Sequence, residues 1–254
     1  MSYEPTQLAL LLGAGLLAGA MNAVTGGGTF VSLPALTAVG LPGTVANASS
    51  STALLPGALA SAWAYRRELR PLERVSTRAL AVASLAGGGV GAGLLLVTPE
   101  AVFDLVIPWL LLAATVTLAI GPRLQGLLQR AGLSAGPRAI LAAQALLGVY
   151  GGYFGGAVGL MMLAAWSLLS QASIAALTPL RTVMLVAANA VAVALFVVMG
   201  QVSWPAALTV MAGAIAGGWA GAQIGRRLPP VVLRGLVLAI TVATTAIFFW
   251  RAYA

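Results

Sequence analysis

Asn22-Ala23-Val24-Thr25-Gly26-Gly27-Gly28-Thr29 interrupts an apolar run near the start of the chain, and apolar sequence resumes on both sides of it. Three adjacent glycines offer a helix no side-chain packing and lose the most backbone entropy on ordering, so we expect the chain to leave the helix here. The peptide groups that lose their helical partners then need other ones. The stretch therefore predicts a broken helix with unpaired backbone groups and short polar side chains beside them.

A second stretch repeats this pattern. Gly151-Gly152-Tyr153-Phe154-Gly155-Gly156-Ala157-Val158-Gly159 also lies inside apolar sequence, and a short apolar segment follows each break, at 29–41 and at 158–170. Both segments are shorter than the about 20 residues that a helix needs to cross a hydrocarbon core of about 30 Å. Whether they span or re-enter stays open at this point. Broken backbone at membrane depth is tolerated only where protein or a wet cavity surrounds it.

The composition places the chain in a lipid bilayer. Of its 254 residues, 60% are hydrophobic and 7% are charged, and the mean hydropathy is +1.00. Soluble globular domains carry far more charge. All 13 basic residues are arginines, which fall mainly in the loops between apolar segments. The net charge of +8 therefore indicates membrane topology and not a nucleic-acid partner.

The residue types that the chain lacks argue against several kinds of functional site. The chain contains no cysteine and no histidine, which removes disulfides, thiolate metal sites, the commonest metal ligand and the usual proton relay. Only five acidic residues are present, and they form no evident catalytic pair. We therefore expect no metal site, no cofactor and no catalytic residue, and a protein that is not an enzyme.

Internal repetition divides the chain into two halves. The sequences of 86–92 and 216–222 agree at five of seven positions, and Gly15, Gly19 and Gly26 fall on glycines 133 positions later. Ten apolar segments can be marked, five in each half: 7–21, 29–41, 46–65, 75–97, 102–120, 138–154, 158–170, 177–199, 204–225 and 231–250. We predict an all-α polytopic helical bundle of two repeats, 1–122 and 138–254, joined by a cytoplasmic linker at 123–137.

The arginines predict opposite orientations for the two repeats. The loop at 66–78 holds five arginines and its counterpart at 200–203 holds none, whereas the loop at 98–101 holds none and its counterpart at 226–234 holds three. Cytoplasmic loops carry the excess of arginine. We therefore predict inverted-topology repeats in the plasma (inner) membrane, with cytoplasmic loops at 66–78, 121–138 and 226–234 and with both termini outside.

The first glycine break is the leading candidate for a binding site. Unwound backbone and helix N-termini present N–H groups and a positive dipole end, which together suit an anion near the middle of the bilayer. The candidate residues here are Asn22, Thr25, Gly26, Gly27 and Gly28. The alternative is close helix packing through small residues, which is the interpretation that we favour for Gly87-Gly88-Gly89 and Gly217-Gly218.

Polar residues at the starts of the third and eighth segments supply further candidates. Ser49 and Ser50 belong to the run Asn47–Thr52, which could instead cap the start of a helix. Arg181 lies inside an apolar segment and not in a loop or at a chain end, and with Thr178 as N-cap it would lie in the first turn of its helix. A guanidinium there either binds an anion or snorkels to the nearby surface, and both interpretations stay open.

These motifs resemble those of the TauE/SafE sulfite exporter family, also called the four-toluene sulfonate uptake family, over nearly the whole chain. The resemblance rests on Gly26-Gly27-Gly28-Thr29-Phe30-Val31-Ser32-Leu33-Pro34, on Ala46-Asn47-Ala48-Ser49-Ser50 and on Gly148-Val149-Tyr150-Gly151-Gly152-Tyr153-Phe154-Gly155. It implies a polytopic protein that moves sulfite, sulfonates or related small anions across the inner membrane. Where members often carry Asn-Ala-x-Lys-Asn, this chain has Thr178-Pro179-Leu180-Arg181-Thr182, which keeps a cation and loses the flanking amides.

The sequence thus predicts a secondary transporter, a permease or exporter, that moves a small anion by alternating access between two inverted halves. Sulfite, an organic sulfonate or a related sulfur-containing anion is the expected substrate, lipid is the other partner, and a homo-oligomer is left open. The candidate binding residues are Asn22, Thr25, Gly26, Gly27, Gly28, Ser49, Ser50 and Arg181. An anion channel of the same fold is the main alternative, and a membrane-embedded enzyme is a weaker one.

Overall fold

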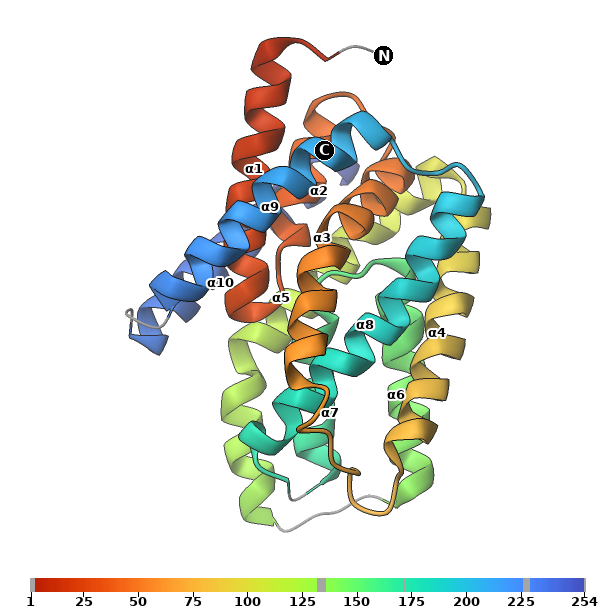
Figure 1. The fold of residues 1–254 in the computed structure, drawn as a ribbon, viewed down its shortest axis with the longest axis vertical. Helices are drawn as coiled ribbons and strands as arrows, with labels where there is room; N and C mark the ends of the chain where they lie inside the picture. The colour runs from red at the N-terminus through yellow and green to blue at the C-terminus, as the bar shows by residue number, and fades with distance from the viewer. Residues whose placement is uncertain (1–2, 132–135, 171, 226–228, 254) are drawn as a thin grey trace.

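The structure is a computed structural model of the chain that describes residues 3–131, 136–170, 172–225 and 229–253. In these ranges it consists of ten α-helices and contains no β-strand (Figure 1). The helices are α1 (Pro5–Thr25), α2 (Thr29–Ala38), α3 (Gly43–Tyr65), α4 (Thr77–Val97), α5 (Glu100–Ala131), α6 (Pro137–Tyr153), α7 (Val158–Leu169), α8 (Ile174–Val198), α9 (Trp204–Gly225) and α10 (Pro230–Tyr253). The predicted all-α bundle of ten segments is confirmed.

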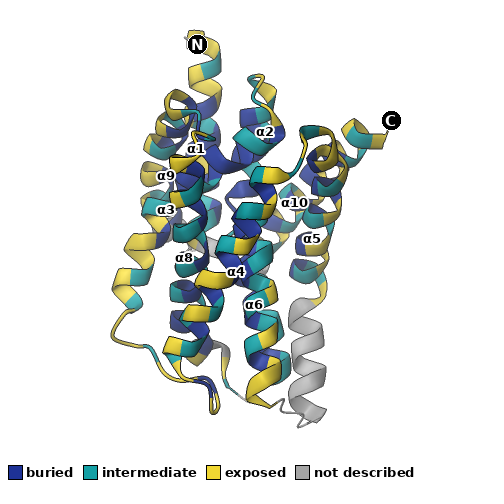
Figure 2. Ribbon diagram, turned by 90° about the vertical axis from the view of Figure 1, so that its right-hand side faces the viewer, coloured by how far each residue is buried: buried dark blue, intermediate teal, exposed yellow. Residues whose placement is uncertain are grey.

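Five of the helices that the structure describes are long and apolar enough to cross a membrane, namely α1, α4, α5, α8 and α10. Large apolar side chains on their outward faces, such as Leu17, Val82 and Trp250, are more than half exposed in the isolated chain. Buried residues gather on the helix faces that are turned to the interior of the bundle (Figure 2). Outward apolar surface of this extent fits a surrounding bilayer, so the chain is a multi-pass membrane protein.

Both helix breaks are present. α1 ends at Thr25, Gly26 has a left-handed backbone with φ +80°, and α2 starts at Thr29. Glycine adopts this conformation without the steric penalty that other residues meet. The second break is shorter than the predicted stretch at 151–159, because α6 continues to Tyr153 and only 154–157 leave the helix.

The helices after the breaks are too short to cross the bilayer alone. α2 has 10 residues and α7 has 12, which at about 1.5 Å per residue gives lengths of about 15 and 18 Å, roughly half of a hydrocarbon core of about 30 Å. The two helices lead to opposite ends of the bundle. Thr37 of α2 accepts a hydrogen bond from Arg251 near the C-terminus, whereas Trp166 of α7 packs with Leu72 of the arginine-rich loop.

Close packing explains why other glycines stay helical. α6 packs along α4, where a Cβ added to Gly152 would lie 2.0 Å from the carbonyl oxygen of Gly88. α1 packs in the same way along α9, where a Cβ added to Gly217 would lie 1.9 Å from the carbonyl oxygen of Leu16. Small residues allow membrane helices to approach this closely. The packing interpretation therefore holds for Gly88 and Gly217.

The remaining helix contacts place α3 at the centre of the bundle. α3 packs against α8 and α9 as well as against α2, its neighbour in the chain, and α5 packs against α10. Between α5 and α10 the hydroxyl of Thr115 is hydrogen-bonded to that of Thr245 at 3.0 Å in a buried position. The central helix thus contacts segments from both parts of the chain (Figure 1).

The two ends of the bundle differ in the segments that lie there: one end carries the chain termini and the other carries the arginine-rich loop. At the terminal end, which carries both chain termini, the Tyr3 hydroxyl is bonded to that of Ser203 at 3.2 Å, and Arg251 donates to Thr37 at 3.2 Å. At the arginine end, Leu72 of the loop at 66–78 is buried against residues of α6, α7 and α8. These names are kept below.

The predicted linker at 123–137 is helical in its first part, because α5 continues to Ala131. Its residues 132–135 lie outside the described ranges, as do residues 226–228 of the loop predicted at 226–234. The division of the chain at this linker stays a prediction.

Candidate functional site

A small cavity lies where the two helix breaks meet. It has a volume of ≈ 20 Å³, and its walls come from both breaks and from α1, α2, α3 and α8. The lining residues are Asn22, Gly26, Thr29, Ser51, Leu54, Ala58, Gly155, Leu185 and Asn189. A volume of this size holds about one water molecule. In this conformation the side chains around the cavity therefore leave almost no free volume inside it.

The two breaks contact each other directly. Phe30 at the start of α2 packs edge to face on Phe154 at the end of α6, with ring centroids 6.4 Å apart. Beside this pair, Gly155 has a left-handed backbone with φ +74°, and a Cβ added to it would lie 3.1 Å from the Ser51 hydroxyl oxygen. Backbone conformation and space both favour glycine at this position.

Ser50 fixes the first break against α3. Its hydroxyl lies 2.6 Å from that of Ser32 in α2, and Ser32 donates to the carbonyl oxygen of Gly28 at 3.2 Å. Either hydroxyl can be the donor in the pair of serines. Both serines are fully buried. This chain of hydroxyl groups ties the broken backbone to the central helix.

Asn47 and Ser49, which are close to Ser50 in α3, form hydrogen bonds with other segments of the chain. Asn47 Nδ2 donates to the carbonyl oxygen of Tyr153 at 2.9 Å, directly before the second break, and Ser49 Oγ accepts from the backbone N–H of Ser203 at 2.9 Å. Both side chains are fully buried. The polar run of α3 therefore connects this helix to both breaks and to the connection between α8 and α9.

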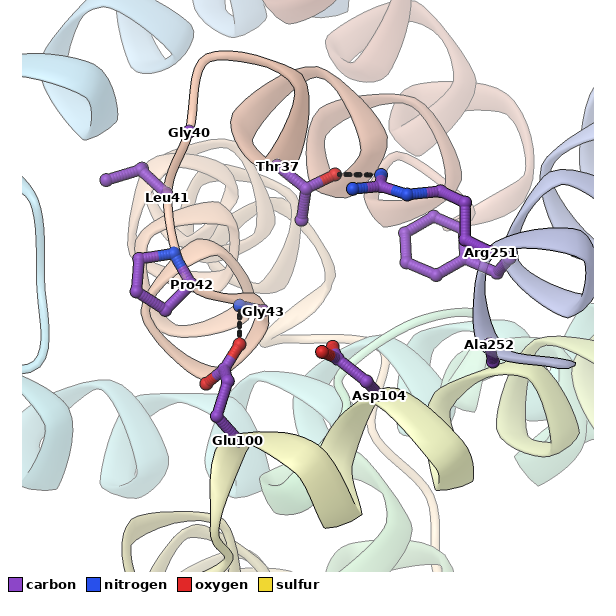
Figure 3. Close-up of a pocket in the computed structure, with 10 residues that line it drawn as sticks. Thr37, Gly40, Leu41, Pro42, Gly43, Glu100, Asp104, Arg251 and Ala252 are labelled. Atoms are coloured by element: carbon purple, nitrogen blue, oxygen red, sulfur yellow. Dashed lines mark hydrogen bonds between the residues drawn. The ribbon is translucent and has the colours of Figure 1, made fainter. Parts of the chain in front are cut away.

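The N-terminus of α3 is held by Glu100 of α5. The Glu100 carboxylate accepts from the backbone N–H groups of Gly43 and Thr44 and from the Thr44 hydroxyl at 2.7 Å. A carboxylate at this place satisfies free N–H groups and the positive end of the helix dipole. The alternative that the polar run caps the helix is therefore wrong. Figure 3 shows Glu100 on a cavity of ≈ 470 Å³ at the terminal end, together with Asp104 and Arg251.

Asn189 of α8 is a cavity residue that was not predicted from the sequence. Its Oδ1 atom is buried and receives no hydrogen bond from the part of the chain that the structure describes. The amide oxygens of Asn47 and Gln144 are unpaired in the same way, and each such oxygen can accept a hydrogen bond from a water molecule or from a ligand that carries a donor. The signal in the sequence was a lone amide within the apolar segment 177–199.

Arg181 lies beside the cavity, on the side of the arginine end. α8 begins at Ile174 with Ser173 as its N-cap, so Arg181 lies about two turns into the helix and not in the first turn as expected. A Cβ added to Gly159 would lie 3.5 Å from its Cδ. Among the described residues Arg181 forms neither a hydrogen bond nor an ion pair.

The predicted binding residues occupy different places around the cavity. Asn22 and Gly26 line it. Gly28 is packed against α1, where its Cβ would lie 2.5 Å from the carbonyl oxygen of Ala18, and Gly27 is buried next to it. The side chain of Thr25 falls outside the described residues. Their role in binding stays a prediction.

The polar groups of the cavity are neutral. Within the described ranges they are the amides of Asn22 and Asn189, the hydroxyls of Thr29 and Ser51, and the backbone at the breaks. Such groups can donate hydrogen bonds to a small anion at the start of a helix. The described part of the chain holds no group of three histidine, cysteine, aspartate or glutamate residues that could hold a metal ion.

Known proteins resemble the chain over almost its full length. The family model for "Sulfite exporter TauE/SafE" matches residues 11–248. A probable membrane transporter protein of Haemophilus influenzae is 27% identical over 94% of this chain and 93% of its own length. The probable membrane transporter protein YfcA of Escherichia coli K12 is 23% identical over 96% of this chain and 90% of its own length. No solved structure gives a significant match.

Proposed function

The chain belongs to the TauE/SafE sulfite exporter family, and from this premise we propose that it is a secondary transporter that binds a small anion in the cavity between its two helix breaks. Membrane transport itself, and not an enzymatic activity, follows from the family and from relatives named as membrane transporters. The proposed substrate is sulfite, an organic sulfonate or a related sulfur-containing anion. The observation that carries the proposal is that both breaks and Asn189 meet at one cavity.

Hydrogen-bond donors support an anionic substrate. The cavity gathers two side-chain amides and two hydroxyls, and α2 starts at its wall with Thr29. The start of α2 presents the positive end of its helix dipole there, while the N–H groups of Phe30, Val31 and Ser32 already donate to the carbonyl oxygens of Gly27 and Gly28. Arg181, one turn before the cavity residue Leu185, supplies positive charge on the side of the arginine end. An anion taken from water would find charge-assisted hydrogen bonds here.

The pairing of helices supports two inverted repeats. When 1–122 and 138–254 are exchanged, the pair α1 and α9 becomes the pair α6 and α4, and both pairs occur. Thr115 and Thr245 bond to each other and are 130 positions apart. A contact between equivalent residues is expected where two related halves meet on a two-fold axis.

The cavity is proposed to lie on the same axis. Of its lining residues, Leu54 and Leu185 are 131 positions apart, and so are Ala58 and Asn189. Equivalent positions of the two repeats thus face each other across the bound solute. Rocking of the halves about this point would open the cavity first to one end and then to the other.

The charge distribution supports an orientation. The loop at 66–78 carries five arginines and lies at the arginine end with the start of α8, whereas both termini lie at the terminal end. Arginine-rich loops stay in the cytoplasm. We propose that the arginine end faces the cytoplasm and that both termini lie outside the inner membrane.

Replacing Asn189 by leucine tests binding separately from stability. Leucine has a similar size and removes the unpaired amide oxygen, so the thermal stability in detergent should stay unchanged or rise. The same change removes a donor to the anion. The half-saturating concentration for labelled sulfite flux into proteoliposomes should therefore rise by about tenfold or more.

Thr209→Val in α9 is the matched control, because this hydroxyl donates to Pro205 of its own helix at 2.8 Å and lies outside the cavity. It should leave transport unchanged. Flux in Asn189→Leu that equals the wild type at every concentration of sulfite and methanesulfonate would contradict the site. Anion currents large enough to resolve from single proteins would identify the channel alternative instead.

A further inference from the structure

The cavity of ≈ 470 Å³ at the terminal end carries charges of both signs. Its walls come from the end of α2, the connection from α2 to α3, the start of α5 and the end of α10 (Figure 3). The charged side chains in these walls are Glu100 and Asp104 of α5 and Arg251 of α10. Small-molecule sites usually have volumes of about 300–1,000 Å³. The cavity therefore has room for a small organic group.

The cavity lies at the level of a membrane interface. The two helices that carry its charges are candidate membrane spans over Glu100–Ile120 and Val232–Tyr253, so the charged residues fall near the ends of these spans. Exposed aromatic side chains lie on the same two helices. Trp109 is 56% exposed and donates to the Tyr253 hydroxyl at 2.9 Å, and Trp250 is 76% exposed. Tryptophan and tyrosine gather where lipid headgroups meet water, so headgroups are the molecules that surround this cavity.

Two of the three charged groups are free to bind a ligand. Glu100 is engaged, because its carboxylate holds the start of α3. Asp104 lines the cavity and forms neither a hydrogen bond nor an ion pair with the residues that the structure describes. Arg251 donates to Thr37 through Nη1 at 3.2 Å, and its other N–H groups make no hydrogen bond within the described ranges. The cavity thus offers one free carboxylate and one guanidinium with donors to spare.

The two free charges lie on different sides of the cavity. Arg251 is held at Thr37 near the end of α2, whereas a Cβ added to Gly43 at the start of α3 would lie 2.9 Å from Oδ1 of Asp104. Figure 3 shows open space between the guanidinium and the carboxylate. A simple ion in this space would pair with only one of them. A group that carries both a phosphate and an ammonium can pair with both.

We propose that this cavity binds the headgroup of an aminophospholipid, a lipid that carries a phosphate and a primary ammonium, as phosphatidylethanolamine does. The ammonium donates to Asp104, and the phosphate accepts from Arg251. The acyl chains run along the outward faces of α5 and α10, where apolar side chains such as Leu105 and Ile247 are exposed. The inference depends on the membrane location of the chain and not on what it transports. A soluble zwitterion with the same two charges is the competing occupant.

Titration with lipids that differ only in the headgroup tests the site. Phosphatidylethanolamine, its N,N-dimethyl derivative and phosphatidylcholine, all with the same acyl chains, are added to the detergent-purified protein, and native mass spectrometry measures the complex with one lipid. Methylation removes N–H donors from the ammonium and leaves the phosphate unchanged. We expect the wild type to bind phosphatidylethanolamine about three- to fivefold more tightly than phosphatidylcholine, which is the range for partly exposed charge pairs. The dimethyl lipid should lie between them.

Two variants separate the roles of the two charges. Asp104→Asn keeps the shape of the side chain and removes its charge, so the affinity for phosphatidylethanolamine should fall close to that for phosphatidylcholine. Arg251→Gln should weaken both lipids by a similar factor and keep their ratio, because both carry the phosphate. Glu4→Gln is the matched control, since Glu4 is an exposed acid near the N-terminus that does not line the cavity, and it should keep the preference.

Equal affinities of the wild type for phosphatidylethanolamine and phosphatidylcholine would overturn the proposal, and this comparison needs no variant. A preference that persists in Asp104→Asn would overturn it as well. Glycerophosphoethanolamine, the same headgroup without acyl chains, is the competitor that distinguishes the two sources. If it displaces phosphatidylethanolamine at the same concentration, the cavity takes a soluble zwitterion and the lipid assignment is wrong. If the lipid stays bound, the assignment stands.

Discussion

Polar residues at the middle of the bundle fall into two groups according to what they bind. Ser49 and Ser50 of α3 are fully buried and hydrogen-bonded to Ser203 and Ser32. Asn189 keeps a buried oxygen without a partner in the described part of the chain. Satisfied groups hold the broken backbone in position. The unpaired Oδ1 atom of Asn189, like that of Asn47, accepts hydrogen bonds and suits a water molecule, so a bound anion would use the side-chain N–H groups of Asn189. The first group therefore shapes the site and the second group is proposed to bind.

Arg181→Ala tests the cation beside the cavity. If the guanidinium attracts and binds the anion, the half-saturating concentration for sulfite flux should rise by about tenfold, since hydrogen bonds to charged groups are worth about 1.5–3 kcal/mol. The measurement is flux in proteoliposomes over a range of sulfite concentrations.

Arg78→Ala serves as its control, because Arg78 is an exposed arginine at the start of α4. It should leave the half-saturating concentration near the wild-type value at physiological salt, where exposed charges are screened. Transport that is unchanged in Arg181→Ala at every concentration would assign Arg181 to snorkelling.

The sequence predicted the place of a cavity at the helix breaks better than the residues that line it. The glycines at 26–28 weaken the helix and a break is found there, whereas the glycines at 87–89 stay helical in α4. Asn22 and Gly26 do line the cavity. Asn189 was not predicted because it follows from the crossing of α3 and α8, which brings it opposite Ala58. Local sequence contains no information on such a crossing.

At the scale of elements, the two short helices begin at the residues expected from the glycine breaks, Thr29 and Val158. Their ends and the exact extent of the second break were harder to predict. Gly152 stays helical where α6 lies against Gly88 of α4 at close range, and Gly151 stays helical beside the Val158 side chain of α7. A glycine that permits helix contact and a glycine that ends a helix look alike in sequence, and only the partner helix distinguishes them.

Gly217→Ala tests the packing of α1 on α9. The added Cβ would lie 1.9 Å from the carbonyl oxygen of Leu16, so the two helices must move apart. Overpacking of this kind lowers the free energy of unfolding by about 1–3 kcal/mol. Thermal unfolding in detergent, followed by circular dichroism, should show a lower midpoint.

Gly13→Ala on α1 is the control, because its Cβ meets no atom within 4 Å. Alanine favours the helix over glycine by about 0.5–1 kcal/mol, so this variant should be as stable as the wild type or more stable. Equal midpoints for both variants would show that the α1 and α9 backbones are not in close contact.

At the scale of the whole molecule, the predicted inversion of the repeats can be measured directly, because the natural chain contains no cysteine. Single cysteines at Arg70 and Pro229 should be protected from a membrane-impermeant maleimide in intact cells. Single cysteines at Pro99 and Trp204 should react. All four positions are exposed at helix ends or in connections, and corresponding connections of the two repeats should then give opposite results.

Labelling of Arg70→Cys and Trp204→Cys from the same side would contradict inversion, since these sites lie in equivalent connections. As a control, all four single-cysteine variants should react with the maleimide after the cells are permeabilised, which shows that each cysteine is accessible to the reagent.

The bond between Thr115 and Thr245 has an evolutionary consequence. If the repeats arose from one gene, a half-length ancestor inserted in both orientations would already have formed this bond between two copies of a single threonine. Duplication and fusion of the gene would then have preserved the contact, and the sequences of the two halves could afterwards diverge independently. On the proposed pairing of the repeats, Ala58 and Asn189 would be copies of one position, and one copy would have lost or gained an amide that a symmetric dimer must carry twice.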